Sequence, residues 1–231
     1  MELSIQAWAA WTPEWCYPVI AEATNNQPDV SWVLPGSRRR LSFFTKMAFY
    51  VAKEVAAAEP SEMIFATRHG DLCKTLKQLD NLVVKEPISP TQFALSVHNA
   101  TAGQYGILSS NQRATTTISA GSETLEAALF AAYARLTSNP ELENIIVVFV
   151  DETIPAIYQG PDSPAETSVA LALRLAKPNS SAPAMLSIEA EPGLQGISQR
   201  SRVHPVLEFF RKNKSSITYA INGYNLHWNH A

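Results

Sequence analysis

The stretch that decides the fold reads Ser96-Val97-His98-Asn99-Ala100-Thr101-Ala102-Gly103, followed by Thr117-Ile118-Ser119-Ala120-Gly121-Ser122. Residues 113–118 are rich in threonine, which favours a strand because β-branched side chains pack well on a pleated surface. The apolar positions after this stretch recur at helical spacing, at Leu125, Ala128, Leu129, Ala132 and Leu136. The pattern predicts a helix, a short strand and a buried helix, with Ser119 in the turn between the last two.

The start of that buried helix has its own signals. Ser122 is a natural N-cap, because its hydroxyl can accept a hydrogen bond from the first turn. Glu123 and Glu126 follow in the first turn, where the helix dipole favours negative charge. We therefore expect Ser122 to cap the helix.

The rest of the chain alternates apolar strands with amphipathic helices. We expect strands at 3–9, 63–67, 145–150 and 169–175, and helices at 42–58, 72–82, 90–107 (continuous) and 203–212. Asn222-Gly223 between 217–221 and 224–228 predicts a β-hairpin, because both turn residues tolerate positive φ. Alternating strands and helices predict an α/β architecture.

Bulk properties exclude several classes of protein. The chain has 231 residues and a net charge of −3, which gives no reason to expect a nucleic-acid partner. No run approaches the ~20 apolar residues needed to span a bilayer, and no basic leader precedes an apolar stretch. Cys16 and Cys73 are too few for a disulfide framework or a zinc site. We expect a cytoplasmic protein with no metal and no cofactor.

The usual catalytic signatures are absent from the sequence. It has no Gly-x-Ser-x-Gly elbow, no Walker loop and no Gly-x-Gly-x-x-Gly. Asp151-Glu152 follows a buried strand, where active sites of α/β proteins often gather. The sequence shows no basic neighbour for these carboxylates, so we interpret them as caps of a turn or helix.

Arg38, Arg39 and Arg40 form a short basic run before the helix at 42–58. A solvated charge run and a contact with phosphate or with a carrier protein both fit this pattern.

Several of these features occur together, in the same order, in one known family. Ser89-Pro90, Ala102-Gly103, the strand from Ala114 to Thr117, Ser119 with Gly121, and the helix through Ala127-Ala128 resemble the N-terminal half of β-ketoacyl synthases. The nearest resemblance is to the short β-ketoacyl synthase chain length factor group, which occurs with type II polyketide systems, including aryl polyene systems. The resemblance covers most of 1–176 and is tightest at 89–129.

The resemblance implies a single ketoacyl synthase-like domain. Residues 1–176 would form half of a thiolase-like fold, and residues 177–231 would add a C-terminal helix and hairpin. Phe209-Phe210 and the rest of the tail from Ser187 would cover part of the apolar face of the central helix.

Two departures from the family pattern bear on function. Ser119, or by a shift of one residue Ala120, stands where the family has its nucleophilic cysteine, and neither cysteine lies near this turn. The two histidines of the family's condensation chemistry lie in a C-terminal half that has no counterpart here, and His204 has no matching context. The resemblance thus implies a non-catalytic subunit. It would pair with a catalytic ketoacyl synthase in polyketide or fatty acid assembly, stabilise the dimer and shape the acyl tunnel.

The resemblance also implies site residues. The tunnel and interface positions are Leu95, His98, Asn99, Thr101, Tyr105, Thr115 and Thr117, and ordinary core packing is an equal alternative at each of the first five. In family dimers the strand before the nucleophile, here 113–118, joins edge to edge. Arg38, Arg39 and Arg40 are the candidate contact with an acyl carrier protein.

Two other functions remain open from the sequence. One is an acyltransferase with Ser119 as nucleophile and His98 or His69 as base. The other is a docking module that binds an acyl carrier protein through Arg38 to Arg40 without any synthase.

Overall fold

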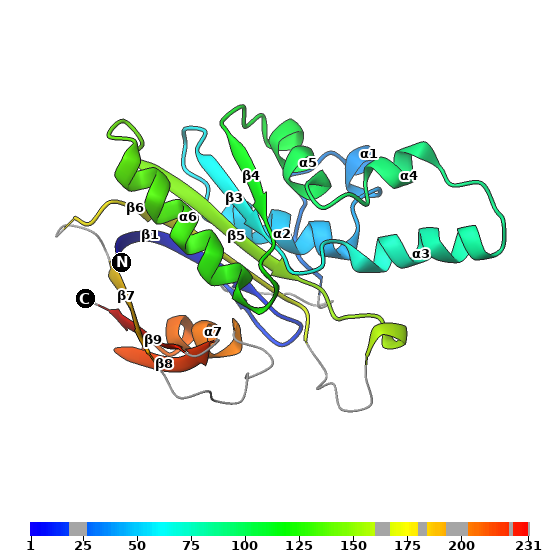
Figure 1. The fold of residues 1–231 in the computed structure, drawn as a ribbon. Helices are drawn as coiled ribbons and strands as arrows, with labels where there is room; N and C mark the ends of the chain where they lie inside the picture. The colour runs from blue at the N-terminus through cyan, green and yellow to red at the C-terminus, as the bar shows by residue number, and fades with distance from the viewer. Residues whose placement is uncertain (19–26, 160–166, 180–183, 193–202, 222–223, 231) are drawn as a thin grey trace.

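The computed structural model describes residues 1–18, 27–159, 167–179, 184–192, 203–221 and 224–230 (Figure 1). Its strands are β1 (Glu2–Trp11), β2 (Cys16–Tyr17), β3 (Glu62–Ala66), β4 (Thr115–Ile118), β5 (Asn144–Asp151), β6 (Val169–Ala176), β7 (Ala184–Pro192), β8 (Ser216–Ile221) and β9 (Tyr224–His230). Its helices are α1 (Pro35–Arg38), α2 (Phe43–Glu54), α3 (Leu72–Val83), α4 (Pro90–Ala94), α5 (Ala100–Ser109), α6 (Thr124–Ser138) and α7 (Val203–Arg211), with 3-10 turns η1 (Gly121–Glu123) and η2 (Ala156–Tyr158).

All the described strands belong to one mixed sheet. Their order is β4-β3-β5-β6-β1-β7-β9-β8, and β2 pairs with β1. Strands β4, β3 and β5 are parallel, whereas the other neighbours are antiparallel. The carboxyl ends of β3, β4 and β5 therefore meet at one end of the sheet. The predicted α/β architecture is confirmed.

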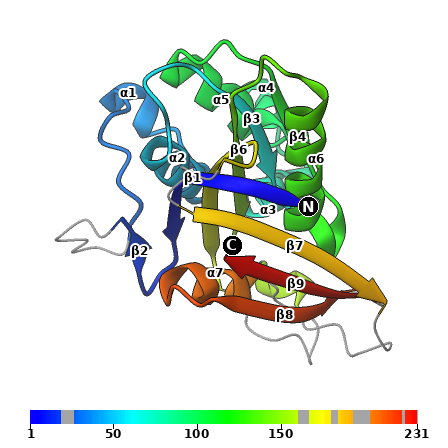
Figure 2. The same ribbon diagram turned by 90° about the vertical axis from the view of Figure 1, so that its left-hand side faces the viewer.

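The sheet is covered on both faces around β5, which explains why β5 is apolar at consecutive positions. Ile145, Val147 and Phe149 pack in the core on the α6 side, and the alternate residues Ile146 and Val148 pack with α2. Helix α5 lies on the α2 side, because Tyr105 belongs to that second core. Figure 2 shows the helices on the two sides of the strands.

The C-terminal segment shares the core of α6, as expected. Phe209 of α7 and Trp228 of β9 are fully buried in this core. The Tyr219 hydroxyl of β8 donates a hydrogen bond to Glu126 of α6 at 2.9 Å. Strands β8 and β9 are the expected hairpin arms, with Ile221 opposite Tyr224. The turn residues Asn222 and Gly223 and the side chain of His204 lie outside the described part.

The expected start of α6 is wrong by one residue. The N-cap position is Glu123, and the 3-10 turn η1 precedes it. Gly121 enters this turn with a φ of +57°, a conformation that glycine adopts without strain. The hydroxyl of Thr124, rather than that of Ser122, accepts the Ala120 N–H at 2.9 Å.

Helix α2 is shorter than expected. Ser42 caps it by accepting the Thr45 N–H, and it ends at Glu54 instead of residue 58.

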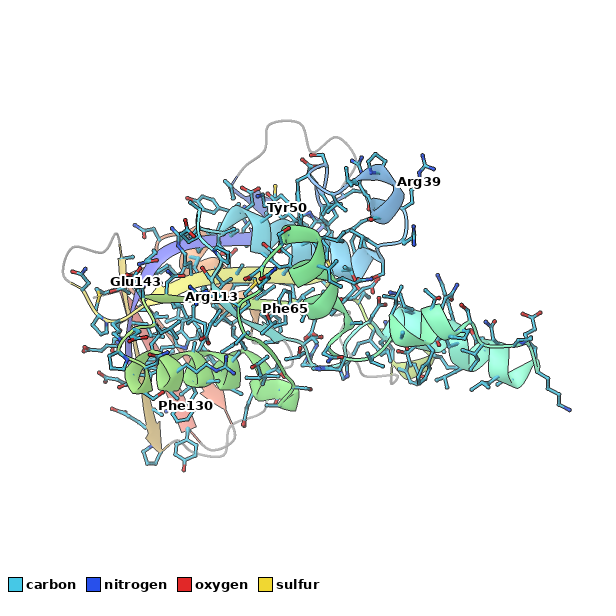
Figure 3. The ribbon with its side chains drawn as sticks, turned by 90° about the horizontal axis from the view of Figure 1, so that it is seen from above. Arg39, Tyr50, Phe65, Arg113, Phe130 and Glu143 are labelled. Atoms are coloured by element: carbon cyan, nitrogen blue, oxygen red, sulfur yellow. The ribbon has the colours of Figure 1, made fainter. Side chains whose placement is uncertain are left out.

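The helix expected over 90–107 is broken into α4 and α5. Tertiary hydrogen bonds fix the break: the Lys74 ammonium donates to the Leu95 carbonyl at 3.2 Å, and His98 Nε2 lies 3.1 Å from the Thr67 carbonyl. Helices α3 and α4 together form an arm that extends from the body of the molecule (Figures 1 and 3). Of α3, only Gln78 is buried.

Strand β7 was not predicted from the sequence. It pairs with β1 through Leu3 and Leu186, and with β9 on its other side. No helix in the described part of the chain is long and apolar enough to cross a membrane.

Candidate functional site

The carboxyl ends of β3 and β5 are joined by a buried ion pair. Asp151 is only 5% exposed and accepts hydrogen bonds from the Thr67 hydroxyl at 3.0 Å and the Arg68 main-chain N–H at 2.9 Å. The Arg68 guanidinium Nε lies 2.7 Å from the second carboxylate oxygen. Burial raises the pKa of Asp151, and Arg68 opposes that rise. The sequence indicated no basic neighbour for Asp151. That prediction is wrong, because Arg68 is such a neighbour.

The turn after β3 also holds the histidine of the deciding stretch. Gly70 has a φ of +64°, and its N–H donates to the Thr67 hydroxyl at 3.0 Å. A Cβ at this position would lie 3.5 Å from Cδ2 of His98. His98 also forms a hydrogen bond with the Thr67 carbonyl, which holds the residues between α4 and α5 against the end of β3. Thr67 in turn bonds Asp151 at the end of β5.

Ser119 lies in the same region, in the turn between β4 and η1. It is exposed, and its hydroxyl donates to the Arg68 carbonyl at 3.0 Å. The residue thus stands just before α6. Neither His98 nor His69 forms a hydrogen bond with this hydroxyl, so no described histidine stands ready as its base.

The two cysteines lie elsewhere, as the sequence indicated. Cys16 is in β2 and Cys73 is in the first turn of α3. Burial and the nearby Glu152 carboxylate raise the pKa of the Cys73 thiol to about 11, which disfavours the nucleophilic thiolate.

The expected tunnel residues have different surroundings in the described part of the chain. Thr101 is buried, with its hydroxyl 3.0 Å from that of Thr45. Tyr105 packs among the rings of Trp32, Phe49 and Phe65, and burial raises its pKa to about 12. It lines a small cavity of about 170 Å³.

The other expected tunnel positions are more open. Leu95 lines a different cavity of about 580 Å³ beside the α3–α4 arm. His98 and Asn99 are exposed. Thr115 and Thr117 pair in register with Met63 and Phe65, which places their side chains on the α5 side of the sheet.

The free edge of the sheet is flanked by two helices, α5 and α6, that carry exposed apolar side chains. Strand β4 pairs only with β3 among the described strands, as the edge position expected for 113–118 requires. On the α5 side Ile107 is 80% exposed, and on the α6 side Phe130 is 67% exposed. Phe130 and Arg113 are labelled in Figure 3. We call β4, Ile107 and Phe130 the edge seam.

The basic run lies at the end of α1. Arg39 and Arg40 are exposed, and Arg40 Nε donates to the Gly36 carbonyl at 3.3 Å. Arg40 also lines the 580 Å³ cavity together with Lys74 and Lys77 of α3. Within the described residues, no group of histidine, cysteine or acidic side chains has the arrangement of a metal site.

The family model described as "Beta-ketoacyl synthase, N-terminal domain" matches residues 8–229. The chain therefore belongs to the β-ketoacyl synthase N-terminal domain family. No curated protein matches the sequence.

Solved structures share this fold at low sequence identity. One is a chain of the ketosynthase (ApeO) in complex with its chain length factor (ApeC) from Xenorhabdus doucetiae, with a TM-score of 0.80, 21% identity and 99% of each chain covered. The ishigamide ketosynthase/chain length factor has a TM-score of 0.65 and 16% identity, over 92% of this chain and 73% of that one. A β-ketoacyl synthase from Burkholderia phymatum STM815 has a TM-score of 0.58 and 10% identity, over 86% and 66%. The expected thiolase-like ketosynthase fold is confirmed.

Proposed function

We propose that this chain is a non-catalytic, chain-length-factor-like subunit that pairs with a catalytic ketoacyl synthase. The pair would act in a type II polyketide system, of which aryl polyene assembly is one kind, or in a fatty acid system. The observation that carries the proposal is the edge seam: a strand with one edge unpaired among the described strands, flanked on each face of the sheet by a helix with an exposed apolar side chain.

The edge seam has the chemistry of a subunit interface. An exposed strand edge offers main-chain donors and acceptors to another strand, and large exposed apolar side chains mark contact surfaces. The solved structures with this fold include a ketosynthase in complex with its chain length factor. Pairing through β4 would extend the sheet into the partner and would bury Ile107 and Phe130.

A non-catalytic role fits the chemistry of residue 119. A serine hydroxyl is a weak nucleophile without an adjacent base, and the Ser119 hydroxyl donates to a main-chain carbonyl. The reactive thiol and histidines would come from the partner. The contribution of this chain would be to stabilise the dimer and, through Tyr105, Thr115 and Thr117 on the α5 side of β4, to shape the acyl tunnel at the interface.

Co-expression with a ketoacyl synthase encoded beside this protein tests the proposal. Ile107→Asp and Phe130→Asp should each weaken the heterodimer at least tenfold, because a charge would replace an apolar contact at the interface. The control is Ile157→Asp, since Ile157 is 72% exposed but lies away from the seam. Size-exclusion chromatography and condensation activity are the readouts. A synthase that is equally soluble, dimeric and active without this chain would refute the proposal.

Two rival functions give different results in the same system. An acyltransferase would form a covalent acyl-Ser119 adduct, visible by intact-mass spectrometry with acyl-carrier substrates and lost in Ser119→Ala. A docking module would bind the carrier protein without any synthase, through Arg38, Arg39 and Arg40, and would weaken as salt is raised.

A further inference from the structure

A cavity lies between the α3–α4 arm and the body of the molecule. Its volume is about 580 Å³, within the range of small-molecule sites. Four segments line it: residues 40–43 before and at the start of α2, the first turns of α3, α4 with its flanking residues, and Glu152 after β5. The cavity is separate from the edge seam, because neither β4, Ile107 nor Phe130 lines it.

Glu152 supplies an unusual group to this cavity. Its Oε2 atom is buried and has no hydrogen-bond partner among the described residues. The Cys73 thiol lies near the same carboxyl group. Buried polar atoms in proteins nearly always have a partner, and Glu152 lines the cavity with one carboxyl oxygen unpaired among the described residues.

The charges around Glu152 come from two segments. Helix α3 contributes Asp71, Cys73, Lys74 and Lys77, the segment before α2 contributes Arg40, and the lining residues of α4 are uncharged. Lys74 is already engaged, since its ammonium lies 3.1 Å from Asp71 Oδ2 and also donates to the Leu95 carbonyl. Lys77 and Arg40 form no ion pair with any described residue.

We propose that this cavity binds a small monocarboxylate with an apolar tail. The carboxylate would lie between Glu152 and the cations Lys77 and Arg40, and the tail would contact Leu41, Phe43 and Leu95. This ligand site goes beyond the subunit role proposed above and does not depend on it.

The protonation of Glu152 selects this ligand chemistry. Burial, and then the nearby Asp71, raise the pKa of Glu152, so that its carboxyl keeps a proton to higher pH than an exposed glutamate. A protonated carboxyl offers an O–H donor to the ligand carboxylate, and Lys77 supplies the opposite charge. An alcohol would lack the charge, and an amine would be repelled by Lys77 and Arg40.

Three probes of equal chain length test the site on the full chain. Calorimetric titration should show binding of octanoate, with 1-octanol and octylamine at least tenfold weaker. Hexanoate should bind up to about fifteenfold more weakly than octanoate, since each fully buried methylene contributes about fourfold. Octanoate affinity should fall as the pH rises through the raised pKa of Glu152, because its carboxyl loses the proton that it donates.

Four variants complete the test. Lys77→Gln and Leu95→Trp should each weaken octanoate binding at least tenfold, whereas Lys85→Gln, a matched lysine outside the cavity, should leave it unchanged. Glu152→Gln should remove the pH dependence. The inference is overturned if octanoate does not bind at millimolar concentration, if the three probes bind equally, or if Lys77→Gln and Lys85→Gln behave alike. Heterodimer formation is measured separately, so either proposal can fail alone.

Discussion

Thr67, Arg68 and Gly70 occupy one turn after β3, yet they meet side chains or main-chain groups from three other parts of the chain. Asp151 comes from the end of β5, His98 from the α4–α5 connection and Ser119 from the end of β4. A single turn therefore positions His98 and Ser119, two polar residues of the stretch that defines the fold. Among the contacts of this turn, we expect the ion pair of Arg68 and Asp151 to contribute most to the free energy of unfolding, because the Asp151 carboxylate is buried.

Removing the acidic partner of this ion pair should cost much of the protein's stability. Asp151→Asn keeps the size of the side chain but removes the carboxylate charge that faces the Arg68 guanidinium. We expect the free energy of unfolding to fall by about 3 kcal/mol. Urea denaturation followed by tryptophan fluorescence measures it.

The control is an exposed ion pair on α7. Glu208 pairs with Arg211 and Lys212 in solvent, so Glu208→Gln should change the free energy of unfolding by less than about 1 kcal/mol. Equal losses in the two variants would mean that the pair of Asp151 and Arg68 contributes no more than a surface contact.

Glu152 gives a pH dependence of stability with a definite sign. Burial raises its pKa in the folded protein, so the folded state binds more protons than the unfolded state above the ordinary glutamate pKa. The contribution of this group to stability is therefore lost as the pH rises through the folded pKa. Glu152→Gln should be more stable than the wild type at pH 8, with a difference that shrinks towards pH 4. Urea denaturation across this range gives the comparison. A constant difference would show that Glu152 titrates normally.

At the residue scale, the sequence predicted where Ser119 would lie but missed its neighbour. Ser119 was placed by local order, as the turn between a β-branched strand and a periodic helix. Arg68 was missed because its partner Asp151 is distant in sequence and close only through the parallel pairing of β3 and β5. A signal was available, since Arg68 and Asp151 each directly follow a predicted strand, and parallel strands bring their carboxyl ends together.

At the scale of elements, β4 has two inequivalent sides. The carbonyls of Ala114 and Ile118 accept hydrogen bonds from Met63 and Thr67, so alternate residues of β4 direct their main-chain groups towards β3. The main-chain N–H and C=O of Thr116 therefore point towards β3, whereas those of Thr115 and Thr117 point to the free edge. The free edge is the part that the proposed partner would use.

A pair of proline substitutions separates folding from pairing. Thr116→Pro removes an N–H from the ladder with β3, as well as the contact of Thr116 with Arg135, and should lower the free energy of unfolding by about 2 kcal/mol or more. Thr117→Pro removes an outward N–H, so it should cost less stability but block pairing with the synthase. Thermal unfolding and size-exclusion chromatography of the co-expressed pair measure these effects. A Thr117→Pro chain that still forms the heterodimer at wild-type yield would exclude pairing through β4.

Elements that depend on local pattern were predicted well, and those that depend on distant contacts were not. The periodic helix α6, the apolar strand β5 and the arms of the β8–β9 hairpin all occur where the sequence indicated. The break between α4 and α5 was missed, because the hydrogen bonds that stabilise it come from Lys74 and Thr67. Local periodicity carries no information about such partners.

At the scale of the whole molecule, the C-terminal segment completes the core on the α6 side of the sheet. Leu186, Phe209 and Trp228 are buried there against strands and α6. The sequence predicted that the tail would cover this face, but not that β7 would join the sheet beside β1. Strand order could not be read from the sequence, because it depends on which distant edges meet.

Removing this segment should therefore expose the core. We expect a chain ending at Asn179 to lose cooperative thermal unfolding and to bind a hydrophobic dye, because several large side chains would lose their partners. Circular dichroism and dye fluorescence are the measurements. A shortened chain with an unchanged midpoint would mean that residues 177–231 form a separate folding unit and not part of one domain.

The position of β1 has a consequence for the order of folding. Ala9 pairs with Ala172 and Leu3 pairs with Leu186, so β1 leaves the ribosome well before the strands with which it pairs are synthesised. Contacts between such distant residues form slowly, because a long loop must close before they stabilise anything. Until then Trp8 and Trp11 cannot pack against β6 and β7. The nascent chain therefore exposes an apolar, aggregation-prone segment that chaperones or other unfinished chains can bind.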